Sequence, residues 1–507
     1  MSQIKKGAVL NYITIFLTNV IGLLMTPFIL SHLGNSEYGI YLAIGALVGT
    51  ISLLDFGLNN AVVRFVAKYK AENDKRGEEN FLATTMLLYI IISSLVVIIG
   101  VIFYFFLIDS YFDKMSPNEI EISKVIFGIL IFNLAVGLPG GALTGICNGY
   151  EDFVFPKSLN IVRYVLRSFA VVGVLMLGGK AIALVVVDSI FNVFVIVITG
   201  LYLRKKLKIT IKLHNFSFTY IKQIFSYSSW IFVFGLVSIF QWKSGYWILV
   251  RIDPDLLTLF GIGITLGTYY GAFSSAISSV FLPRATKMSV QNASGEELTD
   301  MMIKIGRISF IILMFILTSF ILFGEQFVFL WVGDKLGIDG SRQSWIIAIM
   351  IMLGYTLPLV QGFSKSVLEA KGKLRFRALT YLSFMILGTI LGGFLALKHG
   401  ALGMVLGSVI GWLIIQFIMN LYFQNKIKLN IIRFFKQMFH KMTFPLLLSF
   451  TMGYVISYMP GIGWLNFIIK CIIYFMIYSL LMYYLGIIEF EKELLKKTIS
   501  KLKINKK

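Results

Sequence analysis

The sequence has 507 residues, a formal net charge of +21, a hydrophobic fraction of 57% and a mean hydropathy of +0.83. Apolar runs of about 18 residues or more recur along the whole chain, which indicates membrane-spanning helices and excludes an ordinary soluble globular protein. The positive charges lie in short segments between these runs, so the positive-inside rule explains them better than a nucleic-acid partner does.

The alternation of apolar runs and charged turns predicts an all-α polytopic membrane protein with fourteen transmembrane helices. The first run follows Lys5 and Lys6, is too long for a signal-peptide core and lacks a small-residue cleavage site, so we expect it to be an uncleaved helix. The predicted helices are 8–31, 37–67, 81–107, 122–147, 157–178, 181–203, 222–249, 256–283, 304–331, 343–368, 374–397, 400–424, 442–460 and 463–488.

Two parts of the sequence resemble one another at a spacing of about 220 residues. Three glycines share one offset, Gly39, Gly45 and Gly49 matching Gly261, Gly267 and Gly271, and Arg64 matches Arg284 after a shift of two. The dipeptide at 138–139 likewise matches that at 357–358. We therefore predict two related six-helix lobes around a central cavity, residues 1–210 (helices 1–6) and 211–430 (helices 7–12), with helices 13–14 and a basic tail in 431–507.

Lys and Arg are concentrated in alternate connections between the predicted helices, including 68–76, 204–208, 371–377, 426–436 and the tail 492–507. Roughly 35 of the 46 Lys and Arg residues fall on that side, which the positive-inside rule assigns to the cytoplasm. Both chain ends are then cytoplasmic. The tail is expected near anionic lipid headgroups.

Glycines recur every four residues in three of the predicted helices, and such stripes let helix backbones approach closely. Static packing is the simpler interpretation, and faces that slide during transport are the functional one. The stripes are 137–149, 263–271 and 403–411.

Charged residues inside predicted spans are costly and mark candidate functional sites. Lys243 lies deep in the seventh helix, where it either meets an anionic substrate or pairs with Asp55 or Asp188 for structural reasons. Arg163 and Arg167 are four residues apart and share a helix face, an arrangement suited to a phosphate.

The remaining candidates have more local explanations. Asp55 directly precedes the stretch F-G-L-N-N, which predicts an irregularity in the second helix, where Asp55 could cap the chain or pair with Arg64 or Lys243. Asp188 could pair with Arg167 or serve as an ion site, and Lys470 lies outside the repeated part. We assign Lys243, Arg163, Arg167 and Arg64 to a cationic substrate site, and Asp55 and Asp188 to ion coupling or ion pairing.

The sequence contains no pattern that predicts an enzyme. A Gly-rich phosphate loop with Lys and Ser/Thr is missing, no Ser/His/Asp arrangement is visible, and no external connection could hold a catalytic domain. Cys147 and Cys471 lie in apolar segments and are expected to be free thiols, and the histidines lack ligand spacing. We expect no catalytic residue, no cofactor and no metal, and we expect the protein to be a monomer. Since the chain lacks the phosphate loop of an ATPase, any transport that it performs is expected to be driven by an ion gradient or the membrane potential.

Two stretches carry a resemblance to a known family. T-P-F-I-L-S-H-L-G-N-S-E-Y-G-I-Y at 26–41 and D-F-G-L-N-N-A-V-V-R-F-V-A at 55–67 resemble the opening of the polysaccharide-biosynthesis flippases. These are the Wzx-type members of the multidrug/oligosaccharidyl-lipid/polysaccharide (MOP) superfamily. G-A-L-T-G-I-C-N-G-Y-E-D-F at 141–153, followed by P-K-S-L-N-I-V-R, agrees with them.

The resemblance implies alternating access in a bacterial cytoplasmic membrane, an undecaprenyl-diphosphate-linked oligosaccharide as the substrate, and contacts with other polysaccharide-assembly membrane proteins. In the related MurJ-type flippases the extra helix pair forms a groove for the lipid tail, so helices 13 and 14 are the expected counterpart. The chain departs from relatives that have an acidic residue in helix 7, because Lys243–Trp247 occupies that place. A multidrug or cation antiporter of the same superfamily and a membrane glycan polymerase or ligase are the alternative functions.

Overall fold

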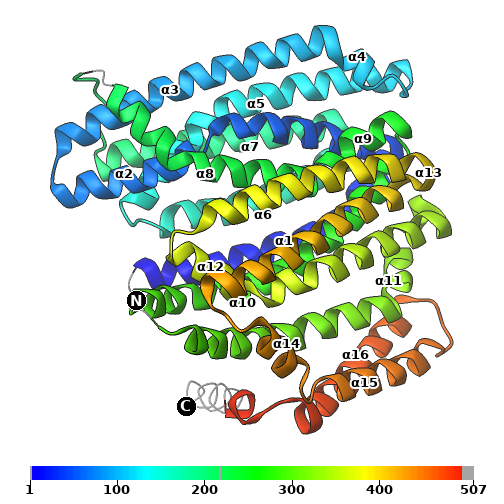
Figure 1. The fold of residues 1–507 in the computed structure, drawn as a ribbon. Helices are drawn as coiled ribbons and strands as arrows, with labels where there is room; N and C mark the ends of the chain where they lie inside the picture. The colour runs from blue at the N-terminus through cyan, green and yellow to red at the C-terminus, as the bar shows by residue number, and fades with distance from the viewer. Residues whose placement is uncertain (1–2, 216–217, 292, 494–507) are drawn as a thin grey trace, which may run out of the picture. The chain divides into compact units, whose positions relative to one another are not determined.

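The computed structural model describes residues 3–215, 218–291 and 293–493, and these residues form helices and short connections without a strand (Figure 1). Ten segments are long and apolar enough to cross a membrane. Three of them contain two helices joined at one glycine: α1 (Gln3–Ile51) at Gly34, α11 (Gly295–Val360) at Gly337 and α13 (Leu374–Tyr422) at Gly400. With the shorter apolar helix α15 (Thr443–Ser457), the described part of the chain holds fourteen apolar helices, which confirms the predicted polytopic all-α fold.

The chain divides into two compact units, Met1–Gly261 with Gly393–Met404, and Ile262–Gly392 with Val405–Lys507. The assignment of residues 1–210, 211–430 and 431–507 to two related lobes and a C-terminal part stays a prediction. The other elements up to residue 261 are η1 (Ser52–Asp55), α2 (Leu58–Glu72), α3 (Lys75–Ile102), η2 (Phe103–Leu107), α4 (Ile108–Tyr111), α5 (Pro117–Gly149), α6 (Val154–Met176), α7 (Ala181–Tyr202), η3 (Leu203–Leu207), α8 (Phe218–Trp242), α9 (Ser244–Ile252) and the start of α10 (Leu256–Val290). The later ones are α12 (Gly362–Ala370), η4 (Phe423–Ile427), α14 (Ile431–Phe439), α16 (Trp464–Leu481) and η5 (Met482–Gly486).

In the first unit α5 packs against α2, α3 and α7, and Figure 1 shows α3, α5 and α7 running along one another. Glycines make these contacts close. A Cβ added to Gly149 would lie 2.8 Å from the Cβ of Val66 on α2, and one added to Gly140 would lie 2.4 Å from the Cγ1 of Ile196 on α7. The lack of a side chain at these two glycines therefore lets the helices approach closely. Gly149 belongs to the 137–149 stripe, so its contact fits the packing interpretation of that stripe, whereas Gly140 is not one of the glycines that form it.

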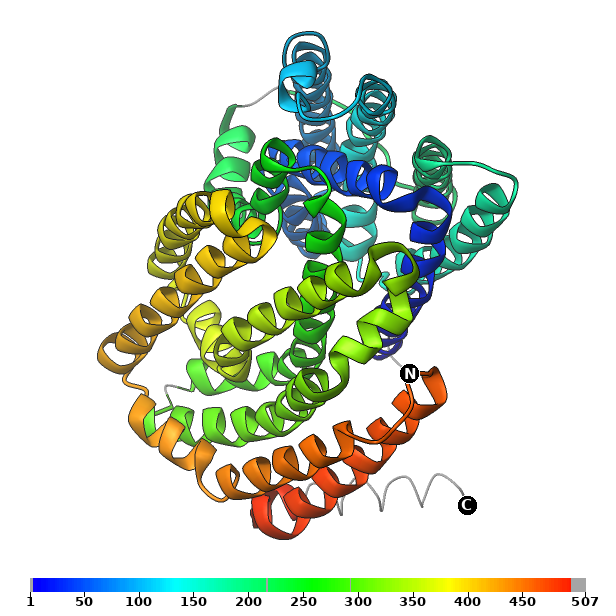
Figure 2. The same cartoon turned by 90° about the vertical axis from the view of Figure 1, so that its right-hand side faces the viewer.

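In the second unit the final helices α15 and α16 run beside each other, in orange and red in Figure 2, and both pack on α11. The two halves of α13 meet backbone to backbone. A Cβ added to Gly407 would lie 2.2 Å from the amide nitrogen of Gly392 and 2.6 Å from the carbonyl oxygen of Gly388. Here too the glycine stripe is a packing surface.

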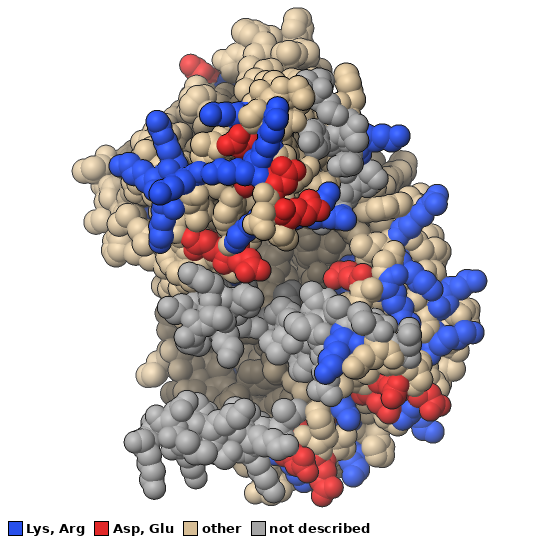
Figure 3. All heavy atoms as spheres, turned by 90° about the vertical axis from the view of Figure 1, so that its left-hand side faces the viewer, with Lys and Arg blue, Asp and Glu red and all other residues tan. Residues whose placement is uncertain are grey.

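Charged side chains gather where α2 ends and α3 begins, and Figure 3 shows Lys and Arg beside Asp and Glu on the face at that end of the molecule. Lys68, Lys70, Lys75 and Arg76 are all exposed there. Asp74 accepts a hydrogen bond from the amide of Gly77 at 2.8 Å and caps α3. This connection between two apolar helices is thus an exposed surface that carries charges of both signs, and its four cations are those of the charge pattern described above.

The helix expected at 37–67 is interrupted by η1 and by two left-handed residues, Phe56 and Gly57, which confirms the irregularity that the sequence predicts after Asp55. Two other local features differ from the sequence-based prediction. The helix expected at 222–249 is interrupted at Lys243. The amphipathic helix α14 was not predicted, because nine residues with two cations are too short for a membrane span. Most of the basic tail, from residue 494, lies outside the described residues.

Candidate functional site

Arg167 on α6 and Asp188 on α7 form an ion pair inside the first unit. The guanidinium Nη2 donates to Asp188 Oδ2 at 3.0 Å, and Nε donates to Oδ1, so the contact is bidentate. The two side chains are 21% and 20% exposed. Tyr41 on α1 has its hydroxyl beside both partners. The sequence named this pairing as one of two alternatives for Asp188.

Lys243 stands at a break between α8 and α9. Its amide nitrogen donates to the carbonyl of Ile239 at 2.7 Å, and its own carbonyl accepts from Tyr246 at 3.1 Å, so the chain stays hydrogen-bonded through the break. The side chain is half-buried, and its ammonium group has no hydrogen-bond or ion-pair partner among the residues that the structure describes. Neither Asp55 nor Asp188 pairs with it, although the sequence allowed either.

The second half of α1 forms a wall shared by these two sites. Tyr41 adjoins the Arg167–Asp188 pair, and a Cβ added to Gly49 would lie 3.9 Å from the Cε of Lys243. The eight residues from Tyr41 to Gly49 correspond to a rise of about 12 Å. Between them, a Cβ added to Gly45 would meet no atom within 4 Å. Open space therefore adjoins α1 between the two cationic side chains.

Arg163 lies one turn before Arg167 on α6, as the spacing predicts. It is half-buried and makes no hydrogen bond or ion pair with any described residue. Arg64 on α2 is different, because it is exposed and its guanidinium carbon lies 6.0 Å from the centre of the Phe65 ring. The structure thus brings Arg167 and Asp188 together, places Arg163 beside them in sequence, and puts Arg64 on a surface.

Asp55 ends η1 and has a local role. The amides of Gly57 and Asn59 donate to its carboxylate, and the hydroxyl of Tyr89 on α3 lies near it. No described Lys or Arg forms an ion pair with it. Of the two roles suggested by the sequence, the capping of the chain is the one present here.

Some polar groups that are buried or half-buried in the structure escaped the sequence-based search. Arg307 on α11 is 1% exposed and pairs with Glu491, and Lys365 is half-buried on α12 next to Arg377. Both fall inside predicted helices, so a count of every charge in those ranges would have found them. The indole nitrogen of Trp247 on α9 is buried without an acceptor in the described part of the chain, and no sequence signal marks it.

Lys470, which had no assigned role, is 5% exposed on α16. Its ammonium group donates to Gln326 Oε1 at 3.2 Å and to the carbonyl of Ser457 at 3.1 Å. These contacts join α16 to α11 and to the end of α15. Lys470 is therefore a structural residue of the C-terminal helices in this structure.

An apolar groove of about 610 Å³ runs between α11 and α16 in the second unit. It lies beside a core cluster formed by Phe323, Tyr474, Tyr478 and Met482. The residues that line the groove are Ile308, Ile311, Ile312, Phe315, Phe475, Tyr478, Ser479, Met482, Tyr483, Ile487 and Glu491. A space of this shape and chemistry suits a hydrocarbon chain.

Comparison with known proteins gives both a family and a fold. The family described as polysaccharide biosynthesis protein matches residues 4–290. A Shigella flexneri protein named "Putative O-antigen transporter" is 21% identical over 414 residues, which cover 81% of this chain and 94% of that protein.

Among solved structures, the lipid II flippase MurJ in an inward closed conformation superposes with a TM-score of 0.74 at 16% identity, covering 96% of this chain and 100% of that one. An inward-facing multidrug resistance MATE family transporter of the MOP superfamily gives 0.62 at 14% identity, with coverage of 83% and 94%. A MOP superfamily transporter from Pyrococcus furiosus gives 0.59 at 16% identity, with coverage of 84% and 95%.

Proposed function

Because the chain belongs to the polysaccharide biosynthesis protein family and is a multi-pass membrane protein with the fold of MurJ and the MATE transporters, we propose that it is a lipid-linked oligosaccharide flippase. It moves an undecaprenyl-diphosphate-linked oligosaccharide from the cytoplasmic to the outer leaflet of a bacterial cytoplasmic membrane by alternating access. The matched relatives are transporters, which confirms the prediction that the chain is not an enzyme.

The observation that carries the proposal is the unpartnered ammonium group of Lys243 next to open space on α1. A half-buried lysine without a counter-ion among the described residues is costly, because a membrane protein interior solvates charge poorly. An anionic ligand would supply the missing counter-charge. The diphosphate of a lipid-linked sugar, or an acidic sugar, has the required chemistry.

Arg163 and Arg167 play unequal parts in this proposal. Arg167 is held by Asp188, so its charge is balanced and it supports the site by fixing α6 against α7. Arg163 has no such partner among the described residues and is the second group that receives the anion. Opening of the cavity to water weakens these attractions, since Coulomb energy falls as the dielectric constant rises, and the anion is then released.

The lipid part of the substrate needs a separate apolar surface. The groove between α11 and α16 is lined by aromatic and aliphatic side chains, and the hydrocarbon tail is assigned to it under this proposal. Each buried methylene contributes about 0.8 kcal/mol, so a long polyprenyl chain gains much affinity from such a groove. The basic candidates Lys243 and Arg163 disfavour the alternative of a cationic-drug exporter.

The proposal is tested by removing the charge and, separately, by filling the open space. Lys243→Ala is expected to abolish flipping of the lipid-linked oligosaccharide in proteoliposomes while folded protein stays at its normal level. Lys243→Arg should partly restore it, because the position needs a positive charge. A drop in folded protein that a second change at Asp55 or Asp188 rescues would instead make Lys243 a structural residue.

The second test changes shape and leaves charge alone. Gly45→Leu places a side chain in the open space beside α1 and should block transport without unfolding the protein. Gly128→Leu is the matched control, because a Cβ there also meets nothing within 4 Å and the residue is exposed on α5. Equal loss of transport in both variants would remove the evidence for a substrate path along α1.

A further inference from the structure

α14 (Ile431–Phe439) is a surface helix fixed to the second unit by one apolar face. Ile431, Phe434 and Met438 are buried, and a Cβ added to Gly306 of α11 would lie 2.7 Å from the Phe434 ring. At its C-terminal end the guanidinium of Arg307 donates to the carbonyls of Gln437 at 2.7 Å and His440 at 2.9 Å. The helix is thus held in one position by packing and by hydrogen bonds.

The neighbouring helices place α14 at a membrane surface. Leu421, near the end of α13, is 48% exposed, and Phe444, at the start of α15, is 66% exposed. Large apolar side chains exposed on helices of this length face lipid. A short amphipathic helix that joins two such segments lies in the interface between hydrocarbon and water.

The exposed side of this segment is basic. Residues 426–441 contain no Asp or Glu and five Lys or Arg residues, Lys426, Lys428, Arg433, Lys436 and Lys441. Among the described residues, this segment makes one ion pair with another element, in which Asp300 on α11 accepts from Arg433 Nη2 at 2.6 Å. Glu296 and Glu297 lie in the first turn of α11, which packs beside Lys428 and Asn430, and neither makes an ion pair with the described residues of the segment. The Arg433–Asp300 pair balances one of the five charges and leaves the segment positive.

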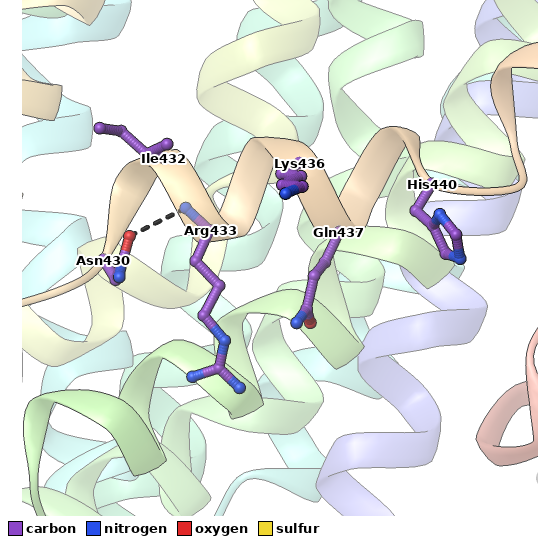
Figure 4. A pocket seen from close by; sticks show the side chains of 6 residues that line it. All are labelled: Asn430, Ile432, Arg433, Lys436, Gln437 and His440. Carbon is purple, nitrogen blue, oxygen red and sulfur yellow. Dashed lines mark hydrogen bonds between the residues drawn. The ribbon is translucent and has the colours of Figure 1, made fainter.

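A cavity of about 530 Å³ opens along this face and is lined by Asn430, Ile432, Arg433, Lys436, Gln437 and His440. Figure 4 shows the side chains of Arg433 and Gln437 extending to the same side of the helix, while Ile432 points away from them. Ile432 is 70% exposed and Phe439 is 41% exposed. Polar donors and exposed apolar groups therefore sit within one helical turn of each other.

We propose that the α14 surface, which comprises the residues lining this cavity together with the neighbouring exposed residues Phe439 and Lys441, binds the headgroup of an anionic phospholipid of the membrane. The Lys and Arg side chains and the amide of Gln437 meet the phosphate, and Ile432 and Phe439 contact the acyl chains. The exposed apolar side chains favour a lipid over a free phosphate, because a free phosphate has no apolar part to cover them. This surface shares no residue with the site proposed for the transported substrate.

The test counts lipids that stay with the full-length protein. The protein is reconstituted in nanodiscs with equal amounts of phosphatidylcholine and phosphatidylglycerol and extracted in mild detergent, and the retained lipids are identified by native mass spectrometry. Lys436→Gln/Lys441→Gln should hold phosphatidylglycerol roughly 30-fold more weakly than the natural sequence, from the contribution of each basic residue at a membrane surface. Both side chains are exposed, so the variant is expected to fold.

The matched control is Lys371→Gln/Lys373→Gln, which removes two exposed charges from another connection in the same unit. Full retention by the control supports a defined site. Equal loss of phosphatidylglycerol from both variants would mean that the overall positive charge of the surface, and not a defined site, holds the lipid, which would overturn the proposal. Unchanged retention of phosphatidylglycerol by the α14 variant would also overturn it. Displacement of the lipid by millimolar inorganic pyrophosphate would also overturn it, since that result assigns the surface to a free phosphate compound. If the double variant does not fold, Lys436→Met alone gives the same readings.

Discussion

The buried guanidinium of Arg307 should be the most sensitive position in the second unit of the chain. It donates to both carboxylate oxygens of Glu491, from Nε at 2.5 Å and from Nη2 at 3.3 Å, and to the carbonyls of Gln437, His440 and Gly486 at 2.7, 2.9 and 3.0 Å. The last two carbonyls flank the α15–α16 pair. A single side chain of α11 therefore fastens both ends of that pair.

Replacement of Arg307 by Met leaves Glu491, which is 4% exposed, buried without its partner. Breaking a buried pair in this way costs about 3–5 kcal/mol, and the three unsatisfied carbonyls add to that cost. For a chain of this size the loss of the ion pair alone corresponds to a fall in Tm of roughly 3–5 °C. The measurement is thermal unfolding of the purified protein in detergent, followed by the fluorescence of a thiol probe on the two free cysteines, of which Cys147 is buried.

Two comparisons make the result interpretable. Arg307→Met/Glu491→Leu should be more stable than Arg307→Met alone, since the second change removes the isolated charge. Arg342→Met breaks another ion pair of α11, with Glu325, but those side chains are 63% and 47% exposed, so it should cost about 0–1 kcal/mol. Equal falls in Tm for Arg307→Met and Arg342→Met would refute the reasoning, as would a double variant no better than the single one.

Three further predictions follow from the packing and the charge pattern. Gly407→Ala should destabilise the protein by about 1–3 kcal/mol, because the new Cβ would meet backbone atoms that cannot rotate away, whereas Gly128→Ala should be neutral or slightly stabilising. Thermal unfolding of the two variants is compared, and similar Tm values would contradict the prediction. Asn80→Ala should speed proteolysis of residues 208–215, because Asn80 Oδ1 accepts hydrogen bonds from the backbone amides of His214 and Asn215 at 2.9 Å each. An unchanged cleavage rate would show that other contacts hold the 208–215 segment. The proposed orientation, with both chain ends in the cytoplasm, is tested in a variant without the native cysteines. A cysteine introduced at Ile338, which is 70% exposed, should react with an impermeant thiol reagent added outside cells, and one introduced at Arg76 should not. The reverse labelling pattern would invert the proposed orientation.

The number and type of the helices could be predicted because apolar runs long enough to cross a membrane have few alternative folds. The breaks inside them could be predicted only in part. The stretch after Asp55 predicts an irregularity, but the φ of 49° at Phe56 is a left-handed conformation that an aromatic residue rarely adopts and that the sequence does not specify. At Lys243 the chain leaves the helix without a proline or glycine at that position, so no residue there predicts the break.

The candidate site could be predicted only as a set of charges. The sequence placed Arg163 and Arg167 on one helix face, and the Arg167–Asp188 contact was one of the options because the two residues lie on consecutive helices. The sequence could not separate a paired arginine from an unpaired lysine, since that difference depends on how each helix is rotated. Arg307 shows the same limit, because its partner Glu491 is 184 residues away along the chain.

Each of the three glycine corners joins two apolar helices through a single residue. Gly34, Gly337 and Gly400 have φ values of 77°, 67° and 55°, and their ψ values of 175°, −175° and −137° belong to a region that other residues essentially do not occupy. A connection with one pair of free dihedral angles cannot stretch as a loop does. The facing ends of the two helices must therefore stay together whenever either helix moves. An epitope tag or a reporter domain inserted at one of these glycines would separate the two helix ends. Insertions meant to preserve transport therefore belong elsewhere in the chain.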